Sequence, residues 1–600
     1  MADSEIKKNS VGSVRACQNC HVEFTIEPDD FAFYEKIKVP SPTFCWQCRL
    51  VRRMSWRNER TLYKRKCDAT GKDIITMFAP EQHVVYERDH WWSDKWDQNE
   101  SGRDYDFNKP FFQQFRELLE KAPLPNVANS NVINSDYSNH NADAKNCYLV
   151  YASYKNEDLA YCSGAVNCKN SLDIYKGLNF TQCYEDVLGS DFNRVFFSYD
   201  SDESVNSAFL HACKNIIDSL GCINMRNKSH AIFNKIYSKE EYVKERAKYD
   251  FGSYKALLDF KKKFAEFIKP YPRRHGFVQK SVNAVGDNIL NAKNVYIGFD
   301  IFGGVEDSKY IVHGWDRVRD VYDGYGFGAN MSNSYEVVDA GLDATYNLFT
   351  VFTHACQNVH YTYACQNSKD LFGCVGLRSK QYCIFNKQYT KEEYEALVPK
   401  IIQHMNDMPY IDANGRIYKY GEFFPTELSP FAYNETIAQE YFPKVESEVL
   451  EAGYRWRAPD TKQYTVTLQP KDLPDHIRDV SDDILKEVIG CEHAGTCNEQ
   501  CMMAFKIIPS ELQFYRAMNL ALPRLCSNCR HYARLAQRTP FMLWDRECQC
   551  GGASSQNGVY NNLGAHPHGQ TPCSNKFKTS YAPNRAEIIY CESCYQQEVA

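Results

Sequence analysis

The strongest constraint on the fold is a repeat of 12 residues. Equivalent repeats, called lines below, begin at Ala144, Asn156 and Cys168. The three lines read "AKNCYLVYASYK", "NEDLAYCSGAVN" and "CKNSLDIYKGLN". Alternating apolar residues bounded by Asn, Asp, Gly and Ser predict short strands separated by turns. Their recurrence at a fixed spacing predicts stacked coils. We expect two lines to form one coil of about 24 residues in a right-handed parallel β-helix.

The chain contains this array twice. Gly221–Tyr242 reads "GCINMRNKSHAIFNKIYSKEEY", and Gly373–Tyr394 reads "GCVGLRSKQYCIFNKQYTKEEY". Residues 130–236 and 285–388 are therefore copies of one unit. One short strand cannot bury its apolar face alone, whereas stacked coils bury it continuously. The alternative is a pair of irregular antiparallel sheets.

The cysteines of the arrays fit a packed core better than a metal site. None of them forms a CxxC pair, and free cysteine behaves as a small buried hydrophobe. They are Cys147, Cys162, Cys168, Cys183, Cys213, Cys222, Cys356, Cys365, Cys374 and Cys383.

We expect a cytoplasmic protein without a membrane segment. The start, "MADSEIKKNSVGSV", lacks the apolar core of a secretory signal, and no run of 18 apolar residues occurs. The 25 cysteines then belong to a reducing compartment, as metal ligands and buried thiols. A secreted disulfide protein is the alternative.

The two ends of the chain are also copies of each other, and they carry paired cysteines. Paired thiols separated by a short insert suit tetrahedral Zn²⁺. The first predicted site is Cys17, Cys20, Cys45 and Cys48, and the second is Cys497, Cys501, Cys526 and Cys529. Cys491 and His493 stand close by, so the first ligand of the second site is open between Cys491 and Cys497.

A further site is predicted near the C-terminus. Cys573, Cys591 and Cys594 are its firm ligands, with Cys548, or alternatively Cys550, as the fourth. His566 and His568 lie nearby, in a predicted loop. The equivalent N-terminal segment retains only Cys67. We therefore predict about three structural Zn²⁺ ions per chain and no open catalytic position.

The segment after Cys48, "RLVRRMSWRNERTLYKRK", is strongly basic. Such density could neutralise phosphates while aromatic rings stack on bases. The alternative is a helix packed on the zinc knuckle, with its arginines paired to acids elsewhere. The candidate nucleic-acid residues are Arg49, Arg52, Arg53, Trp56, Arg57, Arg60, Lys64 and Arg65.

Both ends resemble the zinc-ribbon domains that flank a repeat region in uncharacterised bacterial proteins of the candidate phyla. The shared pattern is paired cysteines, an aromatic pair, a proline before the second cysteine pair and an arginine after it. The resemblance implies zinc and a cytosolic location but no reaction. Its residues are Cys17, Cys20, Phe33, Tyr34, Pro42, Cys45, Cys48 and Arg49, then Cys501, Phe514, Tyr515, Pro523, Cys526, Cys529 and Arg530.

The predicted fold is mainly β, with two tandem right-handed parallel β-solenoid arrays, helical connectors and a zinc-ribbon-like domain at each end. The expected segments are a zinc domain with an aromatic and acidic extension, the first array, a helical connector, the second array, a mixed linker and a double-zinc domain. They span residues 1–128, 129–236, 237–284, 285–388, 389–485 and 486–600.

We expect no enzyme activity. The leading hypothesis is a cytosolic protein that binds RNA or a ribonucleoprotein through basic zinc-ribbon faces. A scaffold that binds a protein partner along the solenoid is the alternative. A carbohydrate-active β-helix is a minor one, with Asp173, Glu185, Asp320 and Glu336 as its candidate acids.

Overall fold

The structure is a computed structural model that describes residues 12–80, 82–458 and 464–599. The first eleven residues, on which the argument about a signal sequence partly rests, lie outside the described ranges. The chain forms two compact units. Unit 1 joins the residues up to Ala128 to Gly276–Arg457, and unit 2 joins Asn129–His275 to the residues from Ala458 onward.

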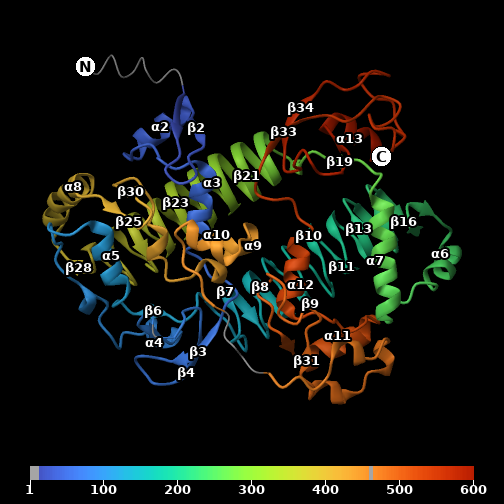
Figure 1. The fold of residues 1–600 in the computed structure, drawn as a ribbon, viewed down its shortest axis with the longest axis horizontal. Helices are drawn as coiled ribbons and strands as arrows, with labels where there is room; N and C mark the ends of the chain where they lie inside the picture. The colour runs from blue at the N-terminus through green and yellow to red at the C-terminus, as the bar shows by residue number, and fades with distance from the viewer. Residues whose placement is uncertain (1–11, 81, 459–463, 600) are drawn as a thin grey trace. The chain divides into compact units, whose positions relative to one another are not determined.

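Each unit contains one β-solenoid array, and together the arrays make about 20 turns (Figure 1). The predicted mainly β fold is confirmed, while the hand of the winding stays a prediction. In unit 2 the array strands are β7 (Asn139–Lys145), β8 (Tyr151–Ala160), β9 (Lys169–Leu172), β10 (Val187–Ser190), β11 (Asn193–Phe196), β12 (Tyr199–Asp202), β13 (Val205–His211), β14 (Lys214–Ile217), β15 (Leu220–Ile223), β16 (Arg226–Ser229), β17 (Ala231–Ile232) and β18 (Lys235–Ile236).

A single line of the sequence repeat makes one coil of unit 2, because parallel partners lie one line apart. Asn139 is opposite Tyr151, and Tyr199 is opposite His211. The expectation of two lines per coil was therefore wrong, because each line closes a full turn by itself. A coil this short must turn sharply, and it does so with a residue of positive φ at every third position, such as Asp143, Asn146 and Leu149.

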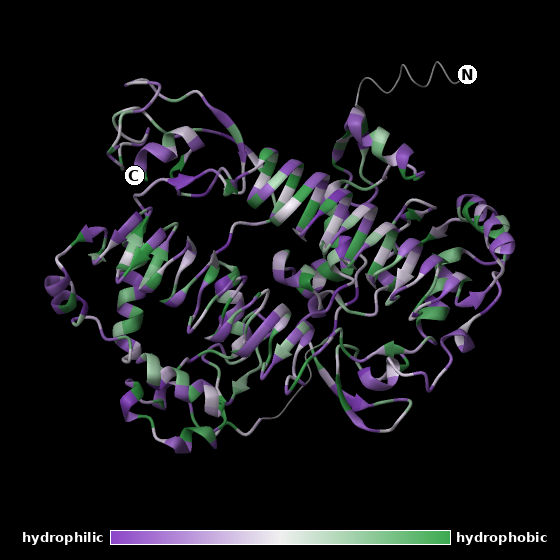
Figure 2. Cartoon of the chain, turned by 180° about the vertical axis from the view of Figure 1, so that it is seen from behind, coloured by the Kyte–Doolittle hydropathy of each residue, from purple (hydrophilic) through white to green (hydrophobic). Residues whose placement is uncertain are grey.

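The interval of three also sets the core. The residue after each positive-φ corner points inward, as Ala144, Cys147 and Val150 do. Four inward side chains per coil leave a narrow interior, in which Cys, Ser, Ala and Val are frequent. All ten array cysteines are buried, as core packing predicted. Bands of hydrophobic and hydrophilic residues alternate along the stacked strands (Figure 2).

Asparagine is frequent at the corners for two physical reasons. It tolerates the left-handed backbone conformation at low cost, and its side chain can bond to a neighbouring coil. Asn134 donates to Asn146 at 3.0 Å, and Asn146 donates to Asp158 at 2.9 Å, one coil further on. These ladders tie successive coils together along the outside.

In unit 1 the coils in the middle part of the array are one residue longer. Val305, Val318, Met331 and Ala344 are successive parallel partners. The additional residue lies in one corner, which has two consecutive positive-φ residues in each coil, as at Asp316 and Arg317. The strands are β20 (Val278–Gln279), β21 (Val282–Trp315), β22 (Val318–Gly328), β23 (Met331–Gly341), β24 (Ala344–His354), β25 (Gln357–Tyr363), β26 (Lys369–Phe372), β27 (Gln381–Ile384) and β28 (Lys387–Gln388).

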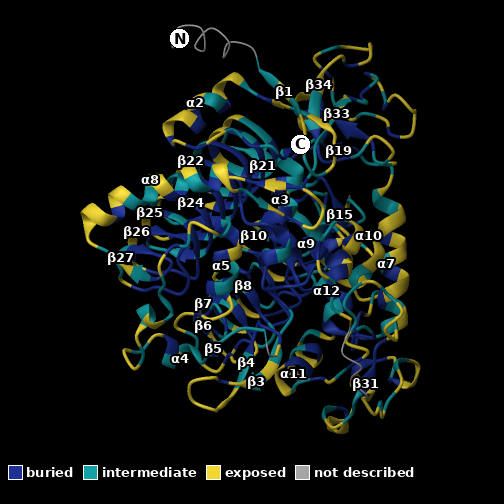
Figure 3. Cartoon of the chain, turned by 60° about the vertical axis from the view of Figure 1, so that its left-hand side comes forward, coloured by how far each residue is buried: buried dark blue, intermediate teal, exposed yellow. Residues whose placement is uncertain are grey.

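The N-terminal zinc-ribbon-like domain, named the N-terminal zinc domain after its candidate metal centre, belongs to unit 1, with the second array. Its knuckle hairpin and two helices are β1 (Ser13–Ala16), β2 (Glu23–Ile26), α2 (Pro28–Lys36) and α3 (Trp46–Met54), and α3 packs on β22 and β23. Further elements of unit 1 are β3 (Tyr63–Lys66), β4 (Asp73–Thr76), β5 (Val85–Tyr86), α4 (Arg88–Trp91), α5 (Phe111–Leu119), β6 (Leu124–Pro125), α8 (Lys391–Asp407), β29 (Tyr410–Ile411), β30 (Ile417–Tyr418), α9 (Ile437–Tyr441) and α10 (Glu446–Glu451). Helix α8 is exposed over much of its surface (Figure 3).

The C-terminal zinc-ribbon-like domain, named the C-terminal zinc domain after its candidate metal centres, belongs to unit 2, with the first array. Its elements are β31 (Ile489–Gly490), β32 (Ala504–Phe505), α11 (Pro509–Met518), α12 (Ser527–Leu535), β33 (Trp544–Glu547), β34 (Lys576–Thr579), β35 (Ile589–Tyr590) and α13 (Glu592–Glu598). The connector helices of unit 2 are α6 (Lys239–Arg246) and α7 (Tyr254–Ile268), and β19 (Arg273–Arg274) pairs with β35.

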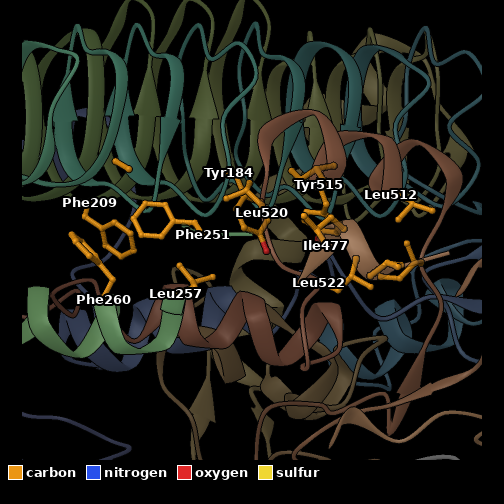
Figure 4. Packing of buried hydrophobic residues seen from close by; sticks show 14 of the residues in the cluster. Tyr184, Phe209, Phe251, Leu257, Phe260, Ile477, Leu512, Tyr515, Leu520 and Leu522 are labelled. Atoms are coloured by element: carbon orange, nitrogen blue, oxygen red, sulfur yellow. The ribbon is translucent and has the colours of Figure 1, made fainter. Parts of the chain in front are cut away.

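A large apolar cluster joins the parts of unit 2. Phe209 of the array packs against Phe251 and against Phe260 of α7, and the same cluster includes Leu512 and Tyr515 of α11 (Figure 4). Within the described residues, no helix is both long enough and apolar enough to cross a bilayer.

Candidate metal centres and the clamps beside them

The first candidate metal centre is formed by Cys17, Cys20, Cys45 and Cys48, whose sulfur atoms all lie within 4.8 Å of one another. Cys17 and Cys20 lie in the turn between β1 and β2, and Cys45 and Cys48 lie at the start of α3. Sulfurs about 2.3 Å from a tetrahedral Zn²⁺ lie about 3.8 Å from each other. The Cys20 and Cys45 sulfurs are 3.8 Å apart, and neither cysteine forms a disulfide.

The protein stabilises negative charge at this centre. The backbone N–H of Cys45 donates to the sulfur of Cys17 at 3.2 Å, and the Asn19 amide donates to Cys48 at 3.2 Å. Hydrogen bonds from the thiols of Cys45 and Cys48 lower the pKa of Cys17 far below that of a free thiol. Because metal ligation requires thiolates, this environment suits a metal centre.

The second centre is formed by Cys491, Cys501, Cys526 and Cys529. The four-thiol group therefore contains Cys491, which the sequence analysis left open as the first ligand, in place of Cys497. The reason is the short pairing of β31 with β32, which places Cys491 directly after a strand, as Cys17 follows β1. The Cys526 N–H donates to Cys491 at 3.3 Å, which matches the contact between Cys45 and Cys17 in the first centre.

The third centre is formed by Cys548, Cys573, Cys591 and Cys594, all buried. These are the four cysteines that the sequence analysis assigned to this site. The sulfurs of Cys573 and Cys591 are 3.9 Å apart. A hydrogen bond from Cys548 lowers the pKa of Cys591 to about 3.

Two further groups lie directly beside the second and third centres. Cys497 lies with His493 and Glu499 next to Cys529. Cys550, His566 and His568 lie next to Cys594. The equivalent of the third centre in the N-terminal domain keeps the hairpin of β3 and β4, but Cys67 belongs to no such group among the described residues.

The arginines predicted to contact nucleic acid are instead buried against the second array. Arg49 forms an ion pair with Asp323 at 2.9 Å, and Arg53 pairs with Asp323 at 3.0 Å. Arg53 also reaches Glu336, at 2.7 Å. The side chains of these residues are at most 2% exposed. This placement corrects the prediction for these arginines, because acids distant in the sequence already neutralise them.

The remaining predicted residues follow the same trend. Arg52 pairs with Glu336 at 2.7 Å and with Glu422 at 3.0 Å, while Arg57 pairs with Glu59 at 2.7 Å. Trp56 is 1% exposed and Arg60 is 8% exposed. Arg65 pairs with Asp68, which leaves Lys64 as the exposed member of the set. A phosphate backbone could not reach the buried members in this structure.

Unit 2 contains the same clamp, built from the equivalent residues. Arg530 and Arg534 of α12 hold Asp173 at 3.0 Å and 2.8 Å. A buried tyrosine and a buried acid complete each clamp: Tyr161 donates to Glu511 at 2.9 Å in unit 2, and Tyr310 donates to Asp30 at 3.3 Å in unit 1. Each zinc domain thus docks on its array through a matching set of charges.

The four acids considered for carbohydrate chemistry are all in ion pairs. Asp173 and Glu336 belong to the clamps, Glu185 pairs with Lys261 at 2.7 Å, and Asp320 pairs with Lys36 at 2.9 Å. Sequence reasoning missed the role of Asp323. The signal that could have found it is its match to Asp173 when the two arrays are aligned, because both stand where an equivalent arginine pair must be neutralised.

Comparison with known proteins adds little. No family model matches the chain, and no curated protein matches it either. One solved structure, from Desulfovibrio desulfuricans G20 and described with the word acetyltransferase, is 8% identical over 48% of this chain and 86% of that one. Its TM-score is 0.10, so the likeness carries no argument about fold or activity.

Proposed function

We propose that the protein is a non-enzymatic scaffold, in which structural zinc ions hold the terminal domains and the β-solenoid arrays present their outer faces to a protein partner. The observation that carries this proposal is the duplicated clamp. The zinc domains use their arginines to dock on the arrays, so these basic residues act inside each unit.

Zinc is the ion that best fits the three four-thiol groups. Four thiolates around a closed tetrahedral position are typical of structural Zn²⁺. In domains with so few strands and helices, the bound ion supplies much of the folding free energy, on the order of 10–16 kcal/mol for zinc-finger peptides. The ions therefore serve the fold of the clamping domains.

Two exposed apolar side chains near one corner of the array in unit 1 support a protein partner over RNA. Trp315 is 44% exposed and Leu342 is 51% exposed. Trp315 is followed by the two-residue corner of its coil, and Leu342 forms part of the corresponding corner two coils further on. Exposed apolar side chains that lie near the same corner of the stack favour contact with another protein more than with a phosphate backbone.

The test is affinity capture from a lysate of the native organism, with and without nuclease. We expect the parent protein to retain a protein partner regardless of nuclease, and the double variant Trp315→Ser/Leu342→Ser to lose it. Val243→Ser, which removes an apolar side chain that is 60% exposed on α6, is the matched control and should retain the partner. Capture that nuclease abolishes, together with a salt-sensitive shift of RNA mobility, would instead support the RNA hypothesis.

A further inference from the structure

We infer that the C-terminal domain holds a pair of metal ions that share the thiolate of Cys594. One ion is the four-thiol centre already described. The other is held by Cys550, His566, His568 and Cys594, whose donor atoms all lie within 4.8 Å of one another. This second position goes beyond the three predicted zinc ions and does not depend on the scaffold role.

The two histidines are oriented as metal ligands are. The Nε2 atom of His566 lies 2.9 Å from a carboxylate oxygen of Glu598, and the side chains of both residues are fully buried. The Nδ1 atom of His568 lies 2.6 Å from the backbone carbonyl oxygen of Thr571. Metal-bound histidines characteristically donate their second ring N–H to a carboxylate or a carbonyl.

These partners determine which ring nitrogens are free to bind. Carbonyl and carboxylate oxygens only accept, so Nδ1 of His568 and Nε2 of His566 carry the hydrogens. The opposite nitrogens then present lone pairs toward sulfur: Nδ1 of His566 lies 3.5 Å from Cys550, and Nε2 of His568 lies 3.3 Å from Cys594. Two nitrogen lone pairs that face two sulfur atoms in this way are the arrangement expected around a bound cation.

One ion cannot satisfy all the donors. Seven side chains surround the two positions, and Zn²⁺ in structural sites takes four ligands. Two tetrahedral ions with one shared ligand use each of the seven. Two Zn²⁺ ions would nearly neutralise the five thiolates that the two positions require. The Asn562 amide donates to the sulfur of Cys550 at 3.2 Å and fixes the position of that sulfur.

A mixed set of two sulfur and two nitrogen donors selects a borderline-soft divalent ion such as Zn²⁺. Calcium and magnesium are excluded because they require oxygen ligands. The shared thiolate makes the two positions interdependent, so loss of the histidine-bound ion should loosen the neighbouring four-thiol centre.

A similar pair is independently indicated at Cys529. His493 Nδ1 and Glu499 Oε2 lie 3.1 Å apart, and both atoms are shielded from solvent without a hydrogen bond, although the two side chains are 35% and 31% exposed. With Cys497 and Cys529 they form a four-donor group that shares Cys529 with the second centre. We propose an additional ion there, which gives Cys497 a role outside the four-thiol set.

Native mass spectrometry of the full-length protein loaded with Zn²⁺ tests both positions. We expect five ions per chain, because the three four-thiol centres each hold one and the two shared positions add one each. His568→Asn should bind one ion fewer, and Glu499→Gln should also bind one fewer. His230→Asn, at a histidine of the first array outside every such group, should match the parent.

A zinc-edge anomalous map of the parent protein tests the sharing without any variant. We expect two peaks near Cys594, each about 2.3 Å from its sulfur. The proposal for Cys594 fails if only one peak is present, if the second peak lacks Cys594 as a ligand, or if His568→Asn binds as much zinc as the parent. The proposal for Cys529 fails if only one peak is present near Cys529, if the second peak lacks Cys529 as a ligand, or if Glu499→Gln binds as much zinc as the parent.

Discussion

At the scale of the residue, the structure separates two kinds of cysteine by their surroundings. In the metal centres, hydrogen bonds between neighbouring thiols lower the pKa of one cysteine, such as Cys17 or Cys591, and raise the pKa of its partner, Cys48 or Cys548. Thiols in the arrays are buried among apolar atoms, and this burial raises the pKa of Cys222 to about 12 and that of Cys147 to about 11. Hydrogen bonds between neighbouring thiols therefore mark the metal centres, whereas burial alone keeps an array thiol protonated and inert.

We therefore predict that the array cysteines do not react in the folded protein. At pH 8 a thiol with a pKa near 12 is almost entirely protonated, and only the thiolate is nucleophilic. Brief treatment with iodoacetamide followed by mass mapping should leave Cys222 unmodified, whereas the denatured chain should be modified throughout. Alkylation of Cys222 at the same rate in both states would contradict this picture of the core.

The sequence predicted some of these roles and missed others, for identifiable reasons. The absence of CxxC pairs in the arrays was sufficient to separate core thiols from ligands. The choice between Cys491 and Cys497 was not decidable, because it depends on where a two-residue strand ends. The arginines were misread because their neutralising acids are remote: Arg52 and Glu336 are 284 positions apart.

At the scale of the element, the solenoid could be predicted from alternation and copying, but the size of its coil could not. Lines as short as these are compatible with one or two lines per turn. The number of lines per turn is decided by the positive φ at every third position. Bulky residues such as Phe197 and Tyr161 occupy some of these corners. The three-residue spacing of the corners can therefore be recognised from Asn and Gly in the sequence at only some positions.

The coil size gives a prediction about deletions. Removing residues 139–150 takes out one full coil near the start of the first array and brings Tyr151 into the register of Asn139. We expect this variant to fold with its remaining coils intact, as judged by circular dichroism and hydrogen exchange. Removing only residues 139–144 should disrupt the coils beside the cut, because half a turn displaces the stacked strands. Equal stability of the two variants would contradict a coil made of a single line.

Metal removal should affect some elements and spare others. Under the proposed role of zinc, the bound ions supply much of the folding free energy of the short hairpins and helices of the zinc domains. The arrays contain no four-donor group among the described residues and keep their cores. Chelation should therefore raise hydrogen exchange by more than a hundredfold in α3, α12 and α13, with little change in β22–β24. Loss of protection in β22–β24 at the same chelator concentration would contradict this separation.

At the scale of the whole molecule, the chain is two versions of one assembly, each an array with a zinc domain docked on it. Unit 1 combines the first zinc domain with the second array, and unit 2 combines the first array with the last domain. The equivalence extends to the clamp residues, since Arg49 and Arg53 correspond to Arg530 and Arg534. Duplication explains why the two units share one sequence pattern. Which zinc domain docks on which array is seen only in the structure.

Hydrogen exchange on a reciprocal pair of variants tests the central claim that buried ion pairs clamp the zinc domains to the arrays. Glu336→Gln leaves Arg52 and Arg53 short of a partner, and Asp173→Asn does the same to Arg530 and Arg534. Breaking a buried pair costs about 3–5 kcal/mol, which corresponds to at least a hundredfold loss of protection where opening is local. Arg319→Gln, at an exposed pair with Asp307, is the control and should cost less than about 1 kcal/mol.

We expect Glu336→Gln to expose α3 while α12 stays protected, and Asp173→Asn to expose α12 while α3 stays protected. Unchanged protection of α3 in Glu336→Gln and of α12 in Asp173→Asn would contradict the account.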